Sequence, residues 1–142
     1  MDTKSALIQE WTILQTQADT YEKHALYIKL MSIGLVSAAL LLNQTGFGII
    51  ALLSVLWLLE AIWKTFQSRI TERLLTVEGA LKVKPDPNDT QLVSPCQLNA
   101  EWLAHRQGFA GLIGEYLSQA IRPTVAFPHV LLIAGVCVVY VS

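Results

Sequence analysis

Two apolar runs separated by a four-residue polar turn decide the fold of this chain. The first run, residues 25–42, is ALYIKLMSIGLVSAALLL, and the second, residues 47–63, is FGIIALLSVLWLLEAIW. The turn between them, residues 43–46, is NQTG. Each run is close to the length of about 20 residues that a helix needs to cross a bilayer. We therefore expect a transmembrane helical hairpin over residues 25–64.

Each run of the hairpin carries one charge, Lys29 in the first and Glu60 in the second. These residues are equally distant from the centre of the turn, so a helical hairpin places them at the same depth. Opposite charges at matched depth in facing helices make an intramembrane charge tolerable. Three interpretations of these two charges remain open. They could form a pair that fixes helix register, form a pair on an ion pathway, or be solvated separately. Ser32 and Ser37 join Lys29 and Glu60 as candidate pore residues.

Small residues indicate where helices approach one another closely. Gly34 and Ala38 form a small-xxx-small step in the first run, which is a common helix-packing motif in membranes. Gly108, Gly111 and Gly114 recur every third residue in a later segment. On a helix they form a smooth strip for another helix, and otherwise they mark a point where the helix is weak.

Composition excludes several classes of function. The chain has 142 residues, of which 53% are hydrophobic, and its net charge of -1 argues against a nucleic-acid-binding surface. Cys96 and Cys137 fall in different kinds of segment, so we expect neither a disulfide nor a metal site from them. Glu101 and His105 are a single i,i+4 pair that supplies two ligands at most. No nucleotide-binding or hydrolase motif is present, so we expect no enzyme and no cofactor.

Amphipathic helices extend both membrane helices away from the turn. Residues 1–24 form a predicted cytoplasmic helix that runs into the first span, and residues 65–84 form a helical extension of the second. The apolar seam of the first extension consists of Leu7, Trp11, Leu14, Ala18 and Tyr21. We expect the two extensions to form an antiparallel stalk, whose narrow seam favours association with further copies. The alternative is a first helix that lies flat on the membrane.

The C-terminal half is predicted to add a loop, an amphipathic helix and a third span. Residues 85–94 have turn composition, and Ser94 and Pro95 are typical of a helix start. Residues 95–122 alternate apolar and polar side chains at helical spacing. We expect a cytoplasmic or interfacial helix there, returning along the stalk or lying at the membrane surface. Residues 124–142 form an apolar run, for which a transmembrane helix is favoured over a buried strand.

The distribution of basic residues predicts the orientation. The 43–46 turn has no Lys or Arg, whereas the segment between the second and third runs carries most of the basic residues. The positive-inside rule then places the N-terminus and this segment in the cytoplasm, and the turn and the C-terminus outside. We therefore expect an all-α integral membrane protein.

The segment from Tyr21 to Leu81 loosely resembles the SLATT-type bacterial membrane domains. The likeness consists of a polar helix leading into the first span, the short outward turn, and residues 57–61 running on into residues 69–78. It implies a pore-forming effector, of the kind often found beside nucleotide-signalling enzymes in defence systems. The third apolar run is an addition to the two-span pattern of that family.

Three classes of function follow from these features. The first is a homo-oligomeric ion channel or pore gated from the cytoplasmic side, since three spans cannot enclose a conduit alone. The second is a non-conducting anchor or scaffold that binds a cytoplasmic protein partner through two surfaces, the Leu7–Leu14 seam and the helix around Trp102 and Phe109. The third is a membrane-embedded enzyme or transporter, for which no inverted repeat is visible. The expected partners are the lipid bilayer and further copies, with no nucleic acid.

Overall fold

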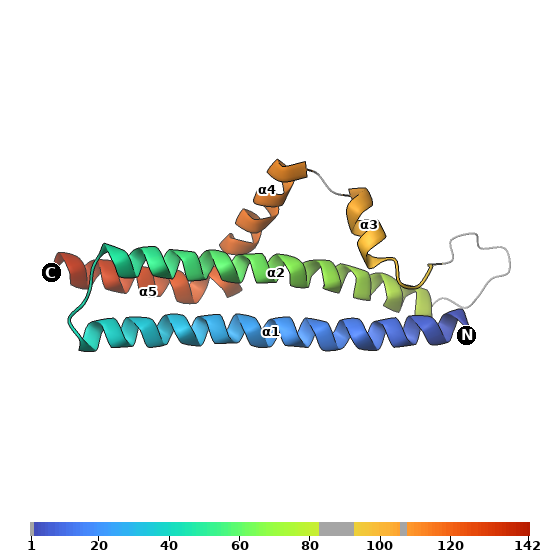
Figure 1. The fold of residues 1–142 in the computed structure, drawn as a ribbon, viewed down its shortest axis with the longest axis horizontal. Coiled ribbons are helices and arrows are strands. Elements are labelled where there is room, and N and C mark those ends of the chain that lie inside the picture. Colours follow the sequence, from blue (N-terminus) through green and yellow to red (C-terminus); the bar gives the residue numbers. More distant parts are fainter. Residues whose placement is uncertain (1, 83–92, 106–107) are drawn as a thin grey trace.

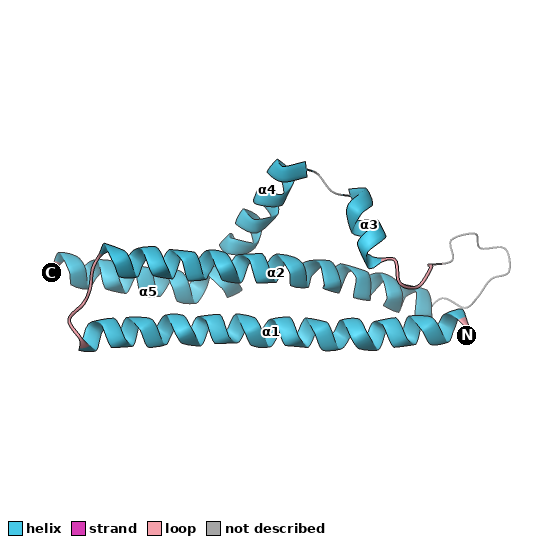
Figure 2. Cartoon of the chain, in the orientation of Figure 1, coloured by secondary structure: helices cyan, strands magenta, loops and turns pink. Residues whose placement is uncertain are grey.

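The structure is a computed structural model that describes residues 2–82, 93–105 and 108–142. In these residues the chain is helical, without strands (Figures 1 and 2). The helices are α1 (Thr3–Leu41), α2 (Phe47–Lys82), α3 (Leu98–His105), α4 (Gly108–Ile121) and α5 (Pro123–Val141). The all-α expectation is confirmed, and the last apolar run is a helix rather than a strand.

Three of these helices, α1, α2 and α5, are long and apolar enough to cross a membrane. With 39 residues, α1 is about 58 Å long at 1.5 Å per residue. That is nearly twice the roughly 30 Å thickness of a hydrocarbon core. The 19 residues of α5 match the core thickness closely. Length alone therefore requires α1 and α2 to project well beyond any bilayer that they cross.

The core is a long antiparallel pair, α1 and α2, with α5 alongside the half of α2 nearest the turn (Figure 1). One buried cluster joins all three helices through Val36, Leu53 and Val136. A second cluster lies in the other half of the pair, between the extensions of α1 and α2. It contains Leu14, Ala18, Ile70 and Leu74.

The apolar seam of the N-terminal extension packs against α2 of the same chain. Leu7 and Leu14 are buried, and the indole N–H of Trp11 donates to Glu78 Oε1 at 3.0 Å. The seam pairs with α2 as the stalk expectation requires. It is therefore closed within one chain, so it offers no docking surface and creates no need for further copies at this point.

The amphipathic segment 95–122 is two helices, so the expectation of one continuous helix is wrong. Helix α3 begins at Leu98 rather than at Pro95, because Cys96 adopts a positive φ of 62°. Helix α4 begins at Gly108 with a φ of +72°, a left-handed conformation that glycine adopts at little cost. The two helices form a bent arm that leaves α2 and returns to it (Figure 1). The predicted loop 85–94 falls mostly outside the described residues.

Candidate functional site

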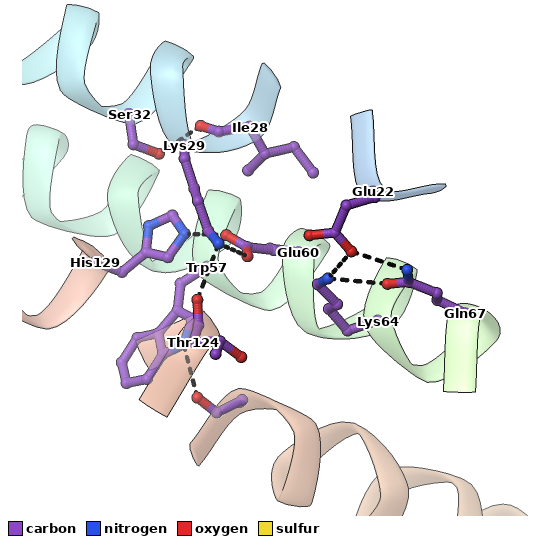
Figure 3. A network of polar contacts seen from close by, with 11 residues as sticks. Glu22, Ile28, Lys29, Ser32, Trp57, Glu60, Lys64, Gln67, Thr124 and His129 are labelled. Carbon is purple, nitrogen blue, oxygen red and sulfur yellow. Dashed lines mark hydrogen bonds and ion pairs between the residues drawn. The ribbon is translucent and has the colours of Figure 1, made fainter. Parts of the chain in front are cut away.

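A buried carboxylate lies where α1, α2 and α5 meet (Figure 3). Glu60 of α2 is fully buried, and its Oε1 lies 3.1 Å from Lys29 Nζ of α1. Its Oε2 lies 2.8 Å from Nε2 of His129 on α5, which is also fully buried. We call Lys29, Glu60 and His129 the charge cluster. Lys29 and Glu60 lie together as their matched depth predicts, and the structure adds His129.

We assign the His129 tautomer on the basis of an ionised Glu60. An ionised carboxylate only accepts, so we assign the proton of His129 to Nε2, which donates to Glu60. Among the described residues, His129 Nδ1 is buried without a hydrogen-bond partner. In the neutral imidazole this atom is an unpaired acceptor rather than an unpaired N–H. The ammonium of Lys29 lies within ion-pair distance of Glu60 Oε1, which accepts no hydrogen bond from the described residues.

Lys29 also satisfies a backbone carbonyl that a proline has deprived of its partner. Its Nζ donates to the carbonyl oxygen of Thr124 at 2.9 Å. In a regular helix that oxygen accepts from the N–H four residues later, but residue 128 is a proline and has none. Without Lys29 this carbonyl would lack its usual donor within the helix. Lys29 thus stabilises the first turn of α5 as well as the charge on Glu60.

Trp57 donates a hydrogen bond to a second backbone carbonyl, close to that of Thr124. Its indole N–H donates to the carbonyl oxygen of Ala120 at 3.1 Å, in the last turn of α4, where carbonyls lack intrahelical partners. Its ring also stacks on His129, with ring centroids 6.4 Å apart. Residues 120–124, which we call the α4–α5 corner, are therefore held by one side chain from α1 and one from α2.

The other predicted pore residues lie in different places. Ser32 is buried beside the charge cluster, and its hydroxyl donates to the carbonyl of Ile28 at 2.9 Å (Figure 3). Ser37 is exposed and donates to the carbonyl of Ile33. Ser32 therefore lies near Lys29 and Glu60, whereas Ser37 lies on the outer surface of α1.

Three of the predicted helix-packing glycines have no close neighbour among the described residues. A Cβ placed on Gly34, Gly108 or Gly114 meets no atom of another residue within 4 Å. Ala38 is exposed on the same side of α1 as Gly34, and Gly111 is half-buried. The small-residue step of α1 is therefore uncovered in the single chain.

A second polar group, beside the charge cluster, links the two extensions. Lys64 Nζ donates to Glu22 at 2.6 Å and to Gln67 at 2.9 Å (Figure 3). The hydrogen bond from Lys64, and then that from Gln67, lowers the pKa of Glu22 below its ordinary value. The side chain of Glu22 is 60% exposed, so we expect this pair to contribute little stability.

A buried arginine forms a further ion-pair network that the sequence analysis missed. Arg73 of α2 is only 2% exposed and forms ion pairs with Glu10 of α1 and Glu101 of α3. It also donates to the carbonyl of Ser94 at 2.7 Å, while Glu10 accepts from the N–H of Cys96 at 2.9 Å. We call Glu10, Arg73 and Glu101 the arginine cluster. It attaches the start of the arm to both long helices.

The arginine cluster makes the folding stability of the protein depend on pH in the acidic range. Burial raises the pKa of Glu10, but the hydrogen bonds from Arg73 and the Cys96 N–H, with the charge of Arg73, outweigh it and leave the pKa below 4.5. The folded state therefore binds this proton less tightly than the unfolded state does, and stability is lost as protons are added.

We expect the contribution of Glu10 to be fully present above about pH 4.5 and to disappear as the pH falls through its lower folded value. Thermal unfolding in mild detergent, followed by helical circular dichroism between pH 7 and pH 3, measures this loss. In Glu10→Gln the acid-dependent fall in unfolding temperature should be shallower. An identical fall in both proteins would contradict the assignment.

An open cavity of about 500 Å³ lies between the arm and α2. Arg69 lies at its wall, with its guanidinium carbon 4.6 Å from the centroid of the Trp102 ring and an ion pair to Glu115 at 2.8 Å. The lining mixes basic and acidic side chains in equal number, Arg69, Arg73, Arg122, Glu72, Glu101 and Glu115. It therefore presents no field of a single sign to a charged ligand.

Comparison of the chain with models of known protein families, with curated proteins and with solved structures found no match. Within residues 2–82, 93–105 and 108–142, no three His, Cys, Asp or Glu side chains are grouped to hold a metal ion. The fold and the site thus define a class: an all-helical membrane protein with three candidate transmembrane helices and a charge cluster around a buried glutamate where they meet.

Proposed function

We propose that this chain is a small integral membrane protein whose copies assemble into a homo-oligomeric ion channel or pore, gated from the cytoplasmic side. The observation that carries the proposal is the uncovered face of α1 formed by Gly34, Ser37 and Ala38. These residues lie three and four positions apart, so they share one side of the helix. A small-xxx-small face lets a second helix approach closely in a bilayer.

The conduit in this proposal lies between copies. The space between the three long helices is filled by Val36, Leu53 and Val136, so one chain has no room for ions there. The outward hydroxyls of Ser37 and Ser54 lie at matched depth in α1 and α2 and supply polar groups for a lining. Glu60 is buried and paired with the half-buried Lys29, so the proposal gives this ion pair the role of holding the helices together.

The arrangement of the chain supports the proposed orientation. The α1–α2 turn and the C-terminus lie at one end, and the N-terminus lies at the other (Figure 1). Residues 30–63 and 123–142 contain no Lys or Arg. The positive-inside rule then favours an N-terminus and an arm in the cytoplasm, with Ser142 outside. The α4–α5 corner is bound by Lys29 of α1 and Trp57 of α2. A movement of the arm is therefore transmitted directly to these two helices of the proposed pore.

The proposal predicts that Gly34→Leu abolishes assembly and conduction, because a bulky side chain on the small-residue face keeps the helices of two copies apart. Native mass spectrometry of the full chain in nanodiscs should show four or more copies for the wild type and smaller species for the variant. Liposomes with the variant should lose their ion flux.

Gly135→Leu is the matched control, since Gly135 is also an exposed, uncovered glycine of a candidate span. We expect it to retain both the assembly and the flux. A wild-type protein that is monomeric or dimeric would overturn the pore, because too few helices would then surround a conduit.

A non-conducting anchor of a larger complex is the second candidate function. It is favoured by Ile13 and Leu75, which are more than half exposed on the extensions of α1 and α2 and lie outside the apolar runs. This function predicts a protein without ion flux that co-purifies with a cytoplasmic partner. Ile13→Ser together with Leu75→Ser should release that partner.

A further inference from the structure

One side of α4 is apolar and uncovered. Its four side chains, from 42% to 76% exposed, are Phe109, Ile113, Leu117 and Ile121. They recur every fourth residue, so they form one stripe along the helix. We call this stripe the outer face of α4. Four large apolar side chains in one stripe are more than the scattered exposure that is normal at a protein surface.

The opposite side of α4 faces the cavity under the arm. Leu112, Glu115 and Gln119 line that cavity together with residues of α2 and α3. At 100° per residue, these positions lie about half a turn around the helix from the outer face. The outer face therefore points away from α3, toward the side on which α5 and the apolar half of α2 run (Figure 1).

The depth of α4 is fixed at its C-terminal end. The carbonyl of Ala120 is held by Trp57, which belongs to the apolar run of α2, and Arg122 alone separates α4 from α5. From this corner α4 slants away from the long axis of the bundle (Figure 1). Phe127 and Val130 of α5, which begins two residues after the end of α4, are also exposed apolar side chains.

We propose that the outer face of α4 is buried in the interfacial region of the bilayer, with the acyl chains of zwitterionic phospholipid as its partner. Interfacial helices of this kind bury an apolar face about 5–10 Å into the boundary of headgroups and chains. The acidic Glu115 of α4 is paired with Arg69, and α4 has no Lys or Arg, so attraction to anionic lipid is not required. The inference rests on the membrane location of the chain and is independent of the pore.

Two adjacent positions of α4 test this inference. Leu117→Cys and Ser118→Cys are made separately in the full chain, with Cys96 and Cys137 replaced by Ser, and each thiol receives a nitroxide spin label. Leu117 belongs to the outer face, whereas Ser118 is exposed and lines the cavity. In phosphatidylcholine nanodiscs, the label at 117 should collide more with oxygen, which concentrates in lipid. The label at 118 should collide more with a water-soluble nickel chelate.

Ile113→Cys repeats the outer-face measurement, and Val138→Cys on the exposed side of α5 gives a reference for lipid contact. Nickel-dominated collisions at 113 and 117, with oxygen-dominated collisions at 138, would overturn the inference and leave the membrane location intact. Labels at 113 and 117 shielded from both reagents would mean that protein covers the face, which also overturns it. Nickel-dominated collisions at 138 would remove the membrane location on which it rests.

Discussion

Replacing Lys29 with Met is expected to destabilise the protein by about 3–5 kcal/mol, the usual cost of removing one partner of a buried ion pair. The variant leaves the fully buried carboxylate of Glu60 with His129 alone. It also leaves the carbonyl of Thr124 without a donor, because residue 128 is a proline. Unfolding of the full chain in mild detergent by added sodium dodecyl sulfate, followed by circular dichroism, measures the loss.

Two further variants separate charge burial from a general effect of mutation. Adding Glu60→Gln to Lys29→Met removes the unpaired charge at nearly constant shape, so we expect most of the lost stability to return. Glu22→Gln breaks an exposed ion pair and should cost at most about 1 kcal/mol. A cost for Lys29→Met no greater than that for Glu22→Gln would refute the role given to the charge cluster.

The pairing of Lys29 with Glu60 could be predicted because a short turn fixes the register of a helical hairpin. Once 43–46 is the turn, depth follows from distance along the sequence, and each run has one charge. The same register also places Val36 opposite Leu53 in the buried cluster. Local sequence is sufficient here because few residues intervene between the two helices.

The third member of the charge cluster could not be found in this way. His129 is 69 residues from Glu60 in sequence, and its position depends on how the arm returns α5 to the bundle. The arm bends near Gly108, where the sequence analysis expected a continuous helix. The sequence contains one indication of this contact. Pro128 has no N–H to donate to the carbonyl of Thr124, which favours a donor from another helix.

The arginine cluster was missed for a different reason. An arginine is typical of a polar helix face, but Arg73 lies three residues after Ile70 and four before Val77, on the buried seam. Glu10 has the same spacing relative to Leu7 and Leu14 on α1. A charge on the apolar seam of each of two facing helices, with opposite signs, is the pattern that would have predicted the pair.

Arg73→Met should therefore be as damaging as Lys29→Met, with an expected loss of about 3–5 kcal/mol. It leaves Glu10, which is buried, with only the N–H of Cys96. It also removes the donor to Ser94 and the charge paired with Glu101, so α3 keeps its contact between Trp102 and Arg69 but loses its ion pair to α2. Denaturant unfolding measures the global loss, and amide hydrogen exchange over residues 93–105 measures the release of the arm. Exchange there should rise by roughly a hundredfold to a few thousandfold, since 1.4 kcal/mol corresponds to a factor of ten.

Lys64→Met is the matched control, because its partner Glu22 is mostly exposed and the expected cost is within about 1 kcal/mol. Arg73→Lys should give an intermediate loss, since an ammonium keeps the charge but not the fork of donors that reaches Glu10, Ser94 and Glu101 together. Faster exchange in α3 with an unchanged unfolding transition would show that Arg73 holds only the arm. Changes in both would mean that it also joins the extensions of α1 and α2, so that a movement of the arm is coupled to the long helices at both of its ends.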